Sequence, residues 1–153
     1  MSEERAVAAL EASGIAYEIT RHGPVGSHAE AARARGVTPD RIVKTLVVRR
    51  AEDDYVLVLV PGDRQISWPK LRTLLGVSRL SMPDAAVAQE ATGYERGTIT
   101  PFSATHAWPV VADERVTGTI SIGAGAHGVG ATLEAADAIV ALAAGVADVT
   151  EAA

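Results

Sequence analysis

The stretch RIVKTLVVRRAEDDYVLVLV, residues 41–60, decides the fold. It contains two apolar runs, 42–50 and 55–60, which are rich in valine, leucine and isoleucine and are separated by an acidic segment at 52–54. β-Branched runs on either side of a short polar segment are typical of paired strands. The pattern therefore predicts a β-hairpin, and the rest of the chain is interpreted around it.

A lysine lies within the first of these runs. Side chains alternate along a strand, so Lys44 shares one face with Ile42, Leu46 and Val48. Burying an unpaired ammonium is strongly unfavourable, so Lys44 needs an explanation. One interpretation is an edge strand on which the lysine stem packs while its head reaches water. The other is a lysine at the floor of a pocket, where its charge serves an anionic or carbonyl-bearing substrate.

The composition indicates one globular domain, 1–153. The chain has 153 residues, of which 48% are apolar, and this suffices for a packed core. It has no cysteine, which excludes a disulfide framework, a thiolate metal site and a cysteine nucleophile. No apolar run approaches the roughly 18 residues of a membrane span, and the acidic N-terminus does not resemble a secretory signal. We therefore expect a cytoplasmic protein without a membrane partner.

Charge is unevenly distributed along the chain. The formal net charge of −5 argues against a general nucleic-acid binder, and we do not expect DNA as a partner. Residues 33–81, however, contain ten basic and five acidic side chains. This basic middle predicts a local surface for an anionic ligand, with a mixed solvated surface as the alternative.

Helices and strands alternate irregularly in the remaining sequence. The fold class is therefore α+β (mixed α/β), a single domain with a mixed sheet flanked by helices. Residues 92–109 hold two glycines and two prolines without a clear period, which predicts a long loop of functional importance. Helices are expected over 2–13, 27–36, 67–75, 83–91 and 135–144, and strands over 15–20, 42–50, 55–60, 78–81, 108–112 and 117–122.

Three common site motifs find no support. The segment GAGAHG, 123–128, matches G-x-G-x-x-G, but a strand-like stretch follows it where the dinucleotide fingerprint requires a helix. It predicts a glycine-lined turn, either close to a ligand or merely structural. The histidines at 22, 28, 106 and 127 lack metal-ligand spacing, so we expect no metal and no cofactor. A G-x-S-x-G elbow is also missing.

Four segments together resemble the YbaK/EbsC family, which comprises the prolyl-tRNA synthetase-associated editing domain and its free-standing aminoacyl-tRNA deacylase relatives. The resemblance extends from about Ile15 to Ala144, and its best signals are Lys44 in a V-K-T-L strand and a G-x-x-x-P loop from Gly97 to Pro101. It implies a mixed, partly barrel-like sheet flanked by helices. The four segments are RIVKTLVV, PGDRQISWPKLRTLLG, MPDAAVAQEATGYERGTITPF and SIGAGAHGVGATLEAADAI.

The resemblance implies trans-editing, the hydrolysis of the ester of mischarged tRNA by water, on a tRNA-Pro-type substrate that carries a small amino acid. Lys44 would hold a phosphate or ribose oxygen, and the loop from Gly97 to Pro101 would present backbone N–H groups to the developing oxyanion. The implied partners are the acceptor end of aminoacyl-tRNA and an aminoacyl-tRNA synthetase, and no cofactor is implied. The implied substrate-binding positions are Thr20, His22, Thr98, Ile99, Thr100, Gly123, Gly125, His127 and Gly128.

The sequence departs from the family pattern at several positions. Thr98 and Ser103 replace glycines of the family loop, and branches that act on cysteinyl-tRNA tend to carry a tyrosine near Thr20, a serine near Gly123 and an acid near Gly130. We therefore do not expect cysteine specificity, and steric exclusion would sort small side chains. Two other functions fit the same residues: a non-catalytic tRNA-end or partner-binding module, and a hydrolase of simple activated esters.

Overall fold

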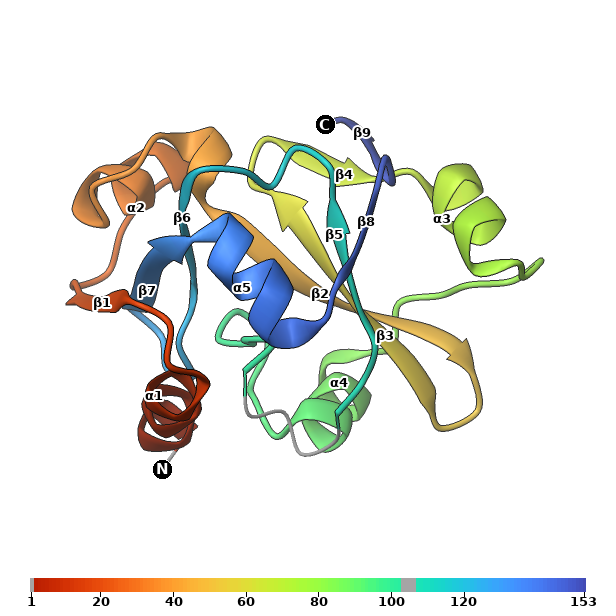
Figure 1. The fold of residues 1–153 in the computed structure, drawn as a ribbon, viewed down its shortest axis with the longest axis horizontal. Helices are drawn as coiled ribbons and strands as arrows, with labels where there is room; N and C mark the ends of the chain where they lie inside the picture. Colours follow the sequence, from red (N-terminus) through yellow and green to blue (C-terminus); the bar gives the residue numbers. More distant parts are fainter. Residues whose placement is uncertain (1, 103–106) are drawn as a thin grey trace.

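A computed structural model describes residues 2–102 and 107–153 of the chain. It is an α+β structure with strands and helices interleaved along the sequence (Figure 1). In chain order the elements are α1 (Ser2–Ser13), β1 (Tyr17–Arg21), α2 (His28–Ala34), the 3-10 turn η1 (Pro39–Arg41), β2 (Val43–Ala51), β3 (Asp54–Pro61), β4 (Arg64–Ile66), α3 (Trp68–Leu75), α4 (Ala85–Thr92), β5 (Val110–Asp113), β6 (Thr119–Gly123), β7 (Val129–Glu134), α5 (Ala135–Leu142), β8 (Gly145–Ala147) and β9 (Thr150–Ala152).

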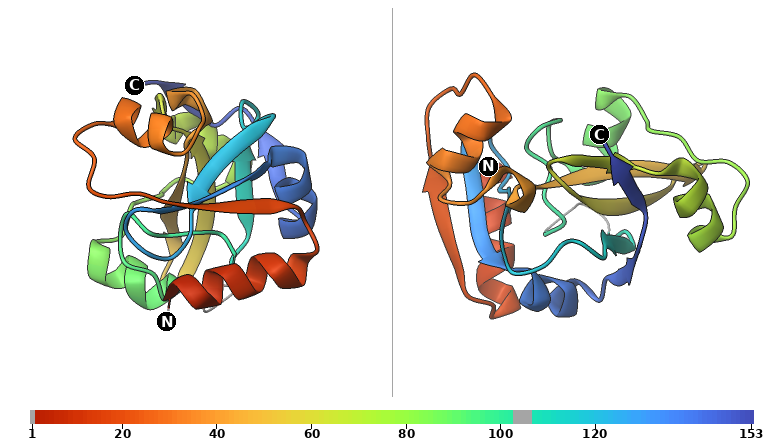
Figure 2. Two further views of the ribbon diagram at one scale, coloured as in Figure 1. Left: turned by 90° about the vertical axis from the view of Figure 1, so that its left-hand side faces the viewer. Right: turned by 90° about the horizontal axis from the view of Figure 1, so that it is seen from above.

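The predicted hairpin is confirmed. Strands β2 and β3 pair antiparallel from Val43 opposite Pro61 to Ala51 opposite Asp54. The turn places Asp53 at a φ of +53°, in the left-handed region that aspartate tolerates better than most side chains. The hairpin is long, and its tip extends beyond the rest of the sheet (Figure 2).

The strands form three sheets. The largest has the order β2-β3-β5-β8, a second has the order β1-β7-β6, and β4 pairs with β9. A parallel bridge between Ile42 and Ser121 connects the first two sheets. Within the largest sheet, β5 runs parallel to both β3 and β8, whereas β2 runs antiparallel to β3. The pairing is thus mixed, as the fold class predicted, and β2 has an open edge beyond the bridge.

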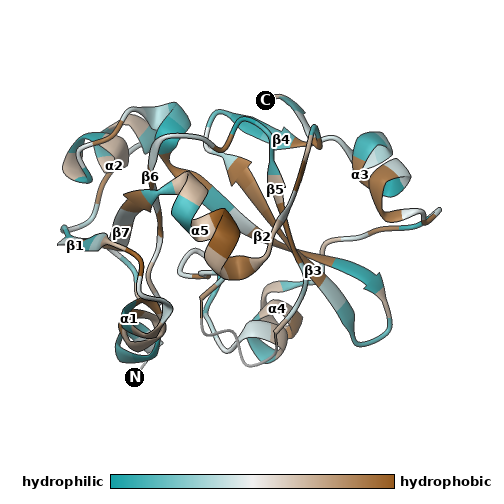
Figure 3. Ribbon diagram, viewed as in Figure 1, coloured by the Kyte–Doolittle hydropathy of each residue, from teal (hydrophilic) through white to brown (hydrophobic). Residues whose placement is uncertain are grey.

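Two apolar cores lie on opposite faces of the hairpin. One fills the space between the two larger sheets and includes Val43, Val47 and Leu57 together with residues of β6, β7 and α5. The other lies on the far face, where Val58 packs with Leu71 of α3. Strand β3 is therefore buried on both sides, and this explains why 55–60 is a continuous apolar run rather than an alternating one (Figure 3).

Some expected elements differ from those observed. The predicted strand at 78–81 is wrong, because only Ser81 pairs there, through an antiparallel bridge to Arg49. Strands β4, β8 and β9 were missed, since each has three residues, too few for an alternating pattern to be recognised. No described helix has both the length and the apolar character needed to cross a membrane.

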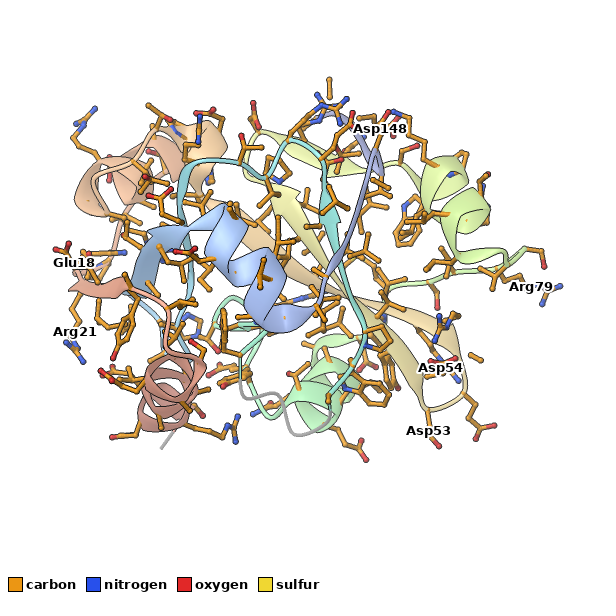
Figure 4. The ribbon with its side chains drawn as sticks, viewed as in Figure 1. Glu18, Arg21, Asp53, Asp54, Arg79 and Asp148 are labelled. Carbon is orange, nitrogen blue, oxygen red and sulfur yellow. The ribbon has the colours of Figure 1, made fainter. Side chains whose placement is uncertain are left out.

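An ion-pair cluster fastens the C-terminal strands. Asp148 lies between β8 and β9 (Figure 4). Its carboxylate accepts hydrogen bonds from Arg115 at 2.8 Å and from Lys70 of α3 at 2.9 Å. The fully buried Asp113 also accepts from Arg115, at 3.2 Å, and from the backbone N–H of Val149, at 3.1 Å. The hydrogen bonds from Arg115 and Lys70 lower the pKa of Asp148 to about 2.

This cluster predicts an acid-sensitive stability. A carboxyl group whose pKa is lower in the folded chain stabilises it above the unfolded pKa, and the contribution is lost as the pH falls through the folded pKa. For Asp148 the window runs from 3.8 down to about 2. We expect Asp148→Asn to lower Tm at neutral pH and the difference from the wild type to shrink across this window in thermal scans. The exposed Glu18→Gln serves as control, and an unchanging difference would contradict the assignment.

Candidate functional site

A cavity of about 380 Å³ opens beside the free edge of β2. Helix α2, the segment that leads into α4, and the loop after α4 complete its walls. Its volume suits a small ligand, or one end of a larger one. The lining residues are His28, Ala31, Arg35, Ile42, Val43, Lys44, Thr45, Leu46, Val47, Met82, Pro83, Ala88, Arg96, Gly97, Ile99 and Gly123.

The lining combines positive charge with an apolar surface. Arg35, Lys44 and Arg96 contribute three cationic side chains, and none of the described lining residues is acidic. Most of the others are aliphatic or glycine. Such a lining favours an anionic ligand that also carries a small apolar group.

Lys44 is one of these cations. Strand β2 lies at the edge of its sheet, so Lys44 is half-buried, and its Nζ donates a hydrogen bond to the carbonyl oxygen of Arg64 at 2.8 Å. Burial lowers the pKa of the Lys44 ammonium, and the charge of Asp63 opposes this shift. A single neutral acceptor leaves two of the three ammonium protons for a ligand or for water.

The loop after α4 is held in place by a buried tyrosine. Tyr94 is fully buried, and its hydroxyl donates to the carbonyl oxygen of Phe102 at 2.8 Å. Arg5 of α1 stacks on the Tyr94 ring at 4.4 Å and donates to the carbonyl oxygen of Gly93 at 2.9 Å. These contacts fix both ends of the segment between Gly93 and Phe102, and the segment therefore presents a defined backbone to the cavity.

Two glycines allow this loop to approach β6 closely. Gly97 has a φ of +89°, which a side chain would disfavour. A Cβ at Gly123 would lie 2.8 Å from the carbonyl oxygen of Ile99 and 3.3 Å from that of Thr98. The Thr98 carbonyl also accepts from the N–H of Gly125 at 3.0 Å. The backbone of the loop thus packs directly on the end of β6.

Comparison with known proteins assigns this architecture to a family. The family model for the aminoacyl-tRNA editing domain matches residues 22–140 of this sequence. The chain belongs to the aminoacyl-tRNA editing domain family. This confirms the resemblance inferred from the sequence.

Two proline–tRNA ligases illustrate the relationship of this editing domain to synthetases. The ligase of Lactobacillus helveticus (strain DPC 4571) is 37% identical over 95 residues, which are 62% of this chain and 17% of the ligase. That of Desulfotalea psychrophila (strain LSv54 / DSM 12343) is 39% identical over 80 residues, 52% of this chain and 14% of the ligase. The chain therefore spans only a small part of the ligases that it matches.

Solved structures share the fold over nearly the whole chain. A candidate trans-editing enzyme for prolyl tRNA synthetase is 25% identical, with a TM-score of 0.88, and the match covers 98% of this chain and 97% of that one. A scaffold protein from a computational epitope-grafting study is 24% identical, with a TM-score of 0.89, and covers 99% of this chain and 98% of its own. The second likeness concerns the fold alone.

The editing domain brings only some of the predicted positions together. Lys44, Gly97, Ile99 and Gly123 line the cavity described above. A second hollow, which also includes Glu3 and Glu4, is lined by three more of the predicted positions, Thr98, Gly125 and His127. Neither hollow is lined by Thr20, His22, Thr100, Pro101 or Gly128. Ser103 and His106 lie outside the described residues.

Sequence reasoning missed Arg35, which lies next to His22, one of the predicted positions, and next to Gly130. Arg35 is half-buried, its Nε donates to Nε2 of His22 at 3.3 Å, and its stem covers Gly130, where a Cβ would lie 2.9 Å from the Arg35 Cδ. Burial lowers the pKa of Arg35. A glycine at 130 is the one signal in the sequence for this packing, since it leaves room for the guanidinium beside the cavity.

No group of three or more metal-ligating side chains was found among residues 2–102 and 107–153. His127 instead lies 3.6 Å from the carboxylate of Glu95, at the surface. His28, which lines the cavity, contacts the carbonyl oxygen of Pro39 at 2.8 Å through its Nε2. Each of these two histidines thus has a partner of its own in the folded chain.

Proposed function

We propose that this editing domain is a trans-acting aminoacyl-tRNA deacylase that hydrolyses the ester of a mischarged, tRNA-Pro-type substrate carrying a small amino acid. The observation that carries the proposal is the cavity itself, in which three cations and an aliphatic wall lie beside a backbone loop. Membership of the editing family and the likeness to a candidate trans-editing enzyme for prolyl tRNA synthetase support it. The similarity to part of two proline–tRNA ligases points to proline tRNA and to a synthetase as partner.

The chemistry requires positioning rather than a protein nucleophile. Lys44 holds a phosphate or ribose oxygen of the terminal nucleotide through a charge-assisted hydrogen bond. Water loses a proton to the solvent and attacks the ester carbonyl, which forms a tetrahedral oxyanion. Backbone N–H groups of the loop stabilise that charge, which is worth about 3 kcal/mol per donor in other hydrolases. The bond from the carbonyl carbon to the ribose oxygen then breaks, and that oxygen takes up a proton and leaves as the hydroxyl of the free tRNA. The N–H of Thr98 already donates to the carbonyl oxygen of Glu95 at 2.9 Å, so Gly97 and Ile99, which line the cavity, are the donors that we assign.

The deciding experiment is a deacylation assay on a panel of mischarged tRNAs. We expect rapid release of one or two small amino acids from tRNA-Pro and no release of proline. Binding of charged tRNA without turnover would favour the non-catalytic module instead. Equal rates on charged tRNA and on free aminoacyl esters would favour a general esterase.

A second basic surface would bind the body of the acceptor stem. Four arginines, Arg49, Arg50, Arg72 and Arg79, line a hollow at the hairpin and the turn after α3. Arg50 is neutralised by Asp54 through two hydrogen bonds of 3.0 Å. Strand geometry separates Lys44 from Arg49 by roughly 17 Å, the distance of several nucleotides. We therefore assign this hollow, the arginine surface, to backbone phosphates.

Removing charge from the arginine surface should weaken tRNA binding without changing the chemistry at the ester. We expect Arg72→Gln with Arg79→Gln to raise KM for charged tRNA. The slope of log K against log salt concentration should become shallower by about 0.7–0.9 for each arginine that contacts a phosphate. Arg21→Gln is the control, because Arg21 lies at the opposite end of the molecule from Arg79 (Figure 4). An equal change of slope in that control would contradict the assignment.

A further inference from the structure

Thr45 carries a polar group without a partner in the cavity wall. It follows Lys44 on β2 but faces the opposite side of the strand, toward the core that contains Val43 and Val47. Its side chain is more than nine-tenths buried, and among the described residues its Oγ1 has no hydrogen-bond partner. A buried hydroxyl of this kind destabilises the free protein. The buried hydroxyl of Ser121 on β6 is also without a partner among the described residues, but Thr45 lines the cavity and Ser121 does not, so a ligand in the cavity can satisfy Thr45.

Thr45 also has the only side-chain oxygen among the described residues that line the cavity. The other nitrogen-bearing side chains in the lining are Arg35, Lys44, Arg96 and His28. The first three only donate hydrogen bonds, and Nε2 of His28 already contacts the Pro39 carbonyl. Because a carbonyl only accepts, Nε2 of His28 carries the proton, and Nδ1 of the neutral ring is an acceptor on an exposed side chain. A ligand group that donates hydrogen bonds therefore finds its buried side-chain acceptor at Thr45.

The backbone of Thr45 adds a second acceptor. Arg49 uses its N–H and its C=O to pair with Ser81, at 2.7 Å and 3.2 Å, on the side of β2 away from β3. Main-chain groups two and four residues apart in a strand point the same way, so the carbonyl of Thr45 also faces the open edge.

We propose that Thr45 binds the α-amino group of the amino acid carried by the tRNA, through its hydroxyl and its carbonyl oxygen. The proposal rests on the deacylase function proposed above and specifies how the substrate is recognised. Lys44 and Thr45 then divide the substrate between the two faces of one strand. Lys44 takes the nucleotide, and Thr45 takes the aminoacyl group. The substrate class is an ester of a free α-amino acid, and esters without the amino group are poor substrates.

The test compares matched esters on one tRNA. The substrates are the aminoacyl-tRNA that the wild type cleaves fastest and its deamino analogue, in which hydrogen replaces the amino group. The measured quantity is kcat/KM for the aminoacyl ester divided by kcat/KM for its deamino analogue. It is determined for the wild type, Thr45→Val and Thr45→Ser. We expect Thr45→Val to lower this ratio by about 10-fold or more and Thr45→Ser to keep it within about 3-fold. Taking each ratio within one variant cancels the different intrinsic reactivities of the esters.

The outcomes separate recognition from packing. A ratio that is equal in wild type and Thr45→Val would overturn the proposal, because a packing defect slows both esters alike. Thr45→Val should also raise Tm in the absence of tRNA, since it removes an unsatisfied buried hydroxyl. A lower Tm would show that the hydroxyl has a partner in the free protein and would overturn the premise. If the wild type cleaves no aminoacyl-tRNA at all, the deacylase function itself fails.

Discussion

Replacing Lys44 by methionine should lower kcat/KM for deacylation by about 100-fold. Methionine keeps most of the apolar stem but loses the ammonium. A hydrogen bond to a charged group is worth about 1.5–3 kcal/mol, which corresponds to roughly 10- to 150-fold in rate. The effect should lie toward the upper end of that range, because Lys44 is half-buried in a cavity wall whose described residues include no acid. Single-turnover assays with charged tRNA measure it directly.

The stability of Lys44→Met distinguishes loss of catalysis from loss of the folded structure. The folded chain loses one hydrogen bond, from Nζ to the Arg64 carbonyl, and is relieved of a partly desolvated charge. Tm should therefore stay close to that of the wild type. Lys70→Met, on α3, is the control for activity after loss of a lysine outside the cavity, and its own Tm should fall because Lys70 donates to Asp148 and to the carbonyl oxygen of Thr150. Full activity of Lys44→Met would identify Lys44 as an edge-strand lysine that merely packs its stem, and the cavity would lose its assigned anion-holding group.

The hairpin could be predicted because its pattern is local. The two runs and the acidic turn lie within residues 41–60, and alternation alone placed Lys44 on one face of its strand. The cavity could not be derived in this way. It is lined by residues from both faces of β2, since that strand is an open edge between the Ile42–Ser121 bridge and the Arg49–Ser81 bridge. Which edges of a sheet stay open depends on contacts between distant segments, and periodicity does not report them.

Arg35 and Thr45 show a second limit of sequence reasoning. Neither stands out in the sequence, because arginine is common on helices and threonine is common in strands. Arg35 becomes notable only when Gly130, 95 positions away, provides the space that its stem covers. Thr45 becomes notable only when its hydroxyl is found without a partner. Both observations, the space over Gly130 and the hydroxyl without a partner, result from tertiary packing. They can be recognised only in the three-dimensional structure.

Gly123→Ala should reduce deacylation by about 10- to 100-fold while leaving the chain folded. Gly123 is not at a positive φ, so alanine suits its backbone, and the effect is steric. The new Cβ would lie 2.8 Å from the carbonyl oxygen of Ile99, so the loop that carries Gly97 and Ile99 must move away from β6. Misplacing a catalytic group by about 1 Å can cost about 100-fold in rate. Forcing one methyl group into a packed site costs about 1–3 kcal/mol of stability.

A matched glycine shows that the loop, rather than the substitution, causes the loss. Gly145 on β8 has no positive φ, and a Cβ there meets no atom within 4 Å, so Gly145→Ala should leave both activity and Tm unchanged. If Gly123→Ala retains full activity at wild-type Tm, the loop tolerates displacement, and its backbone N–H groups do not set the rate. If it loses activity while tRNA binding persists, the backbone between Gly97 and Pro101 acts on the ester. The nucleotide contacts of Lys44 then hold the substrate in place independently of that loop.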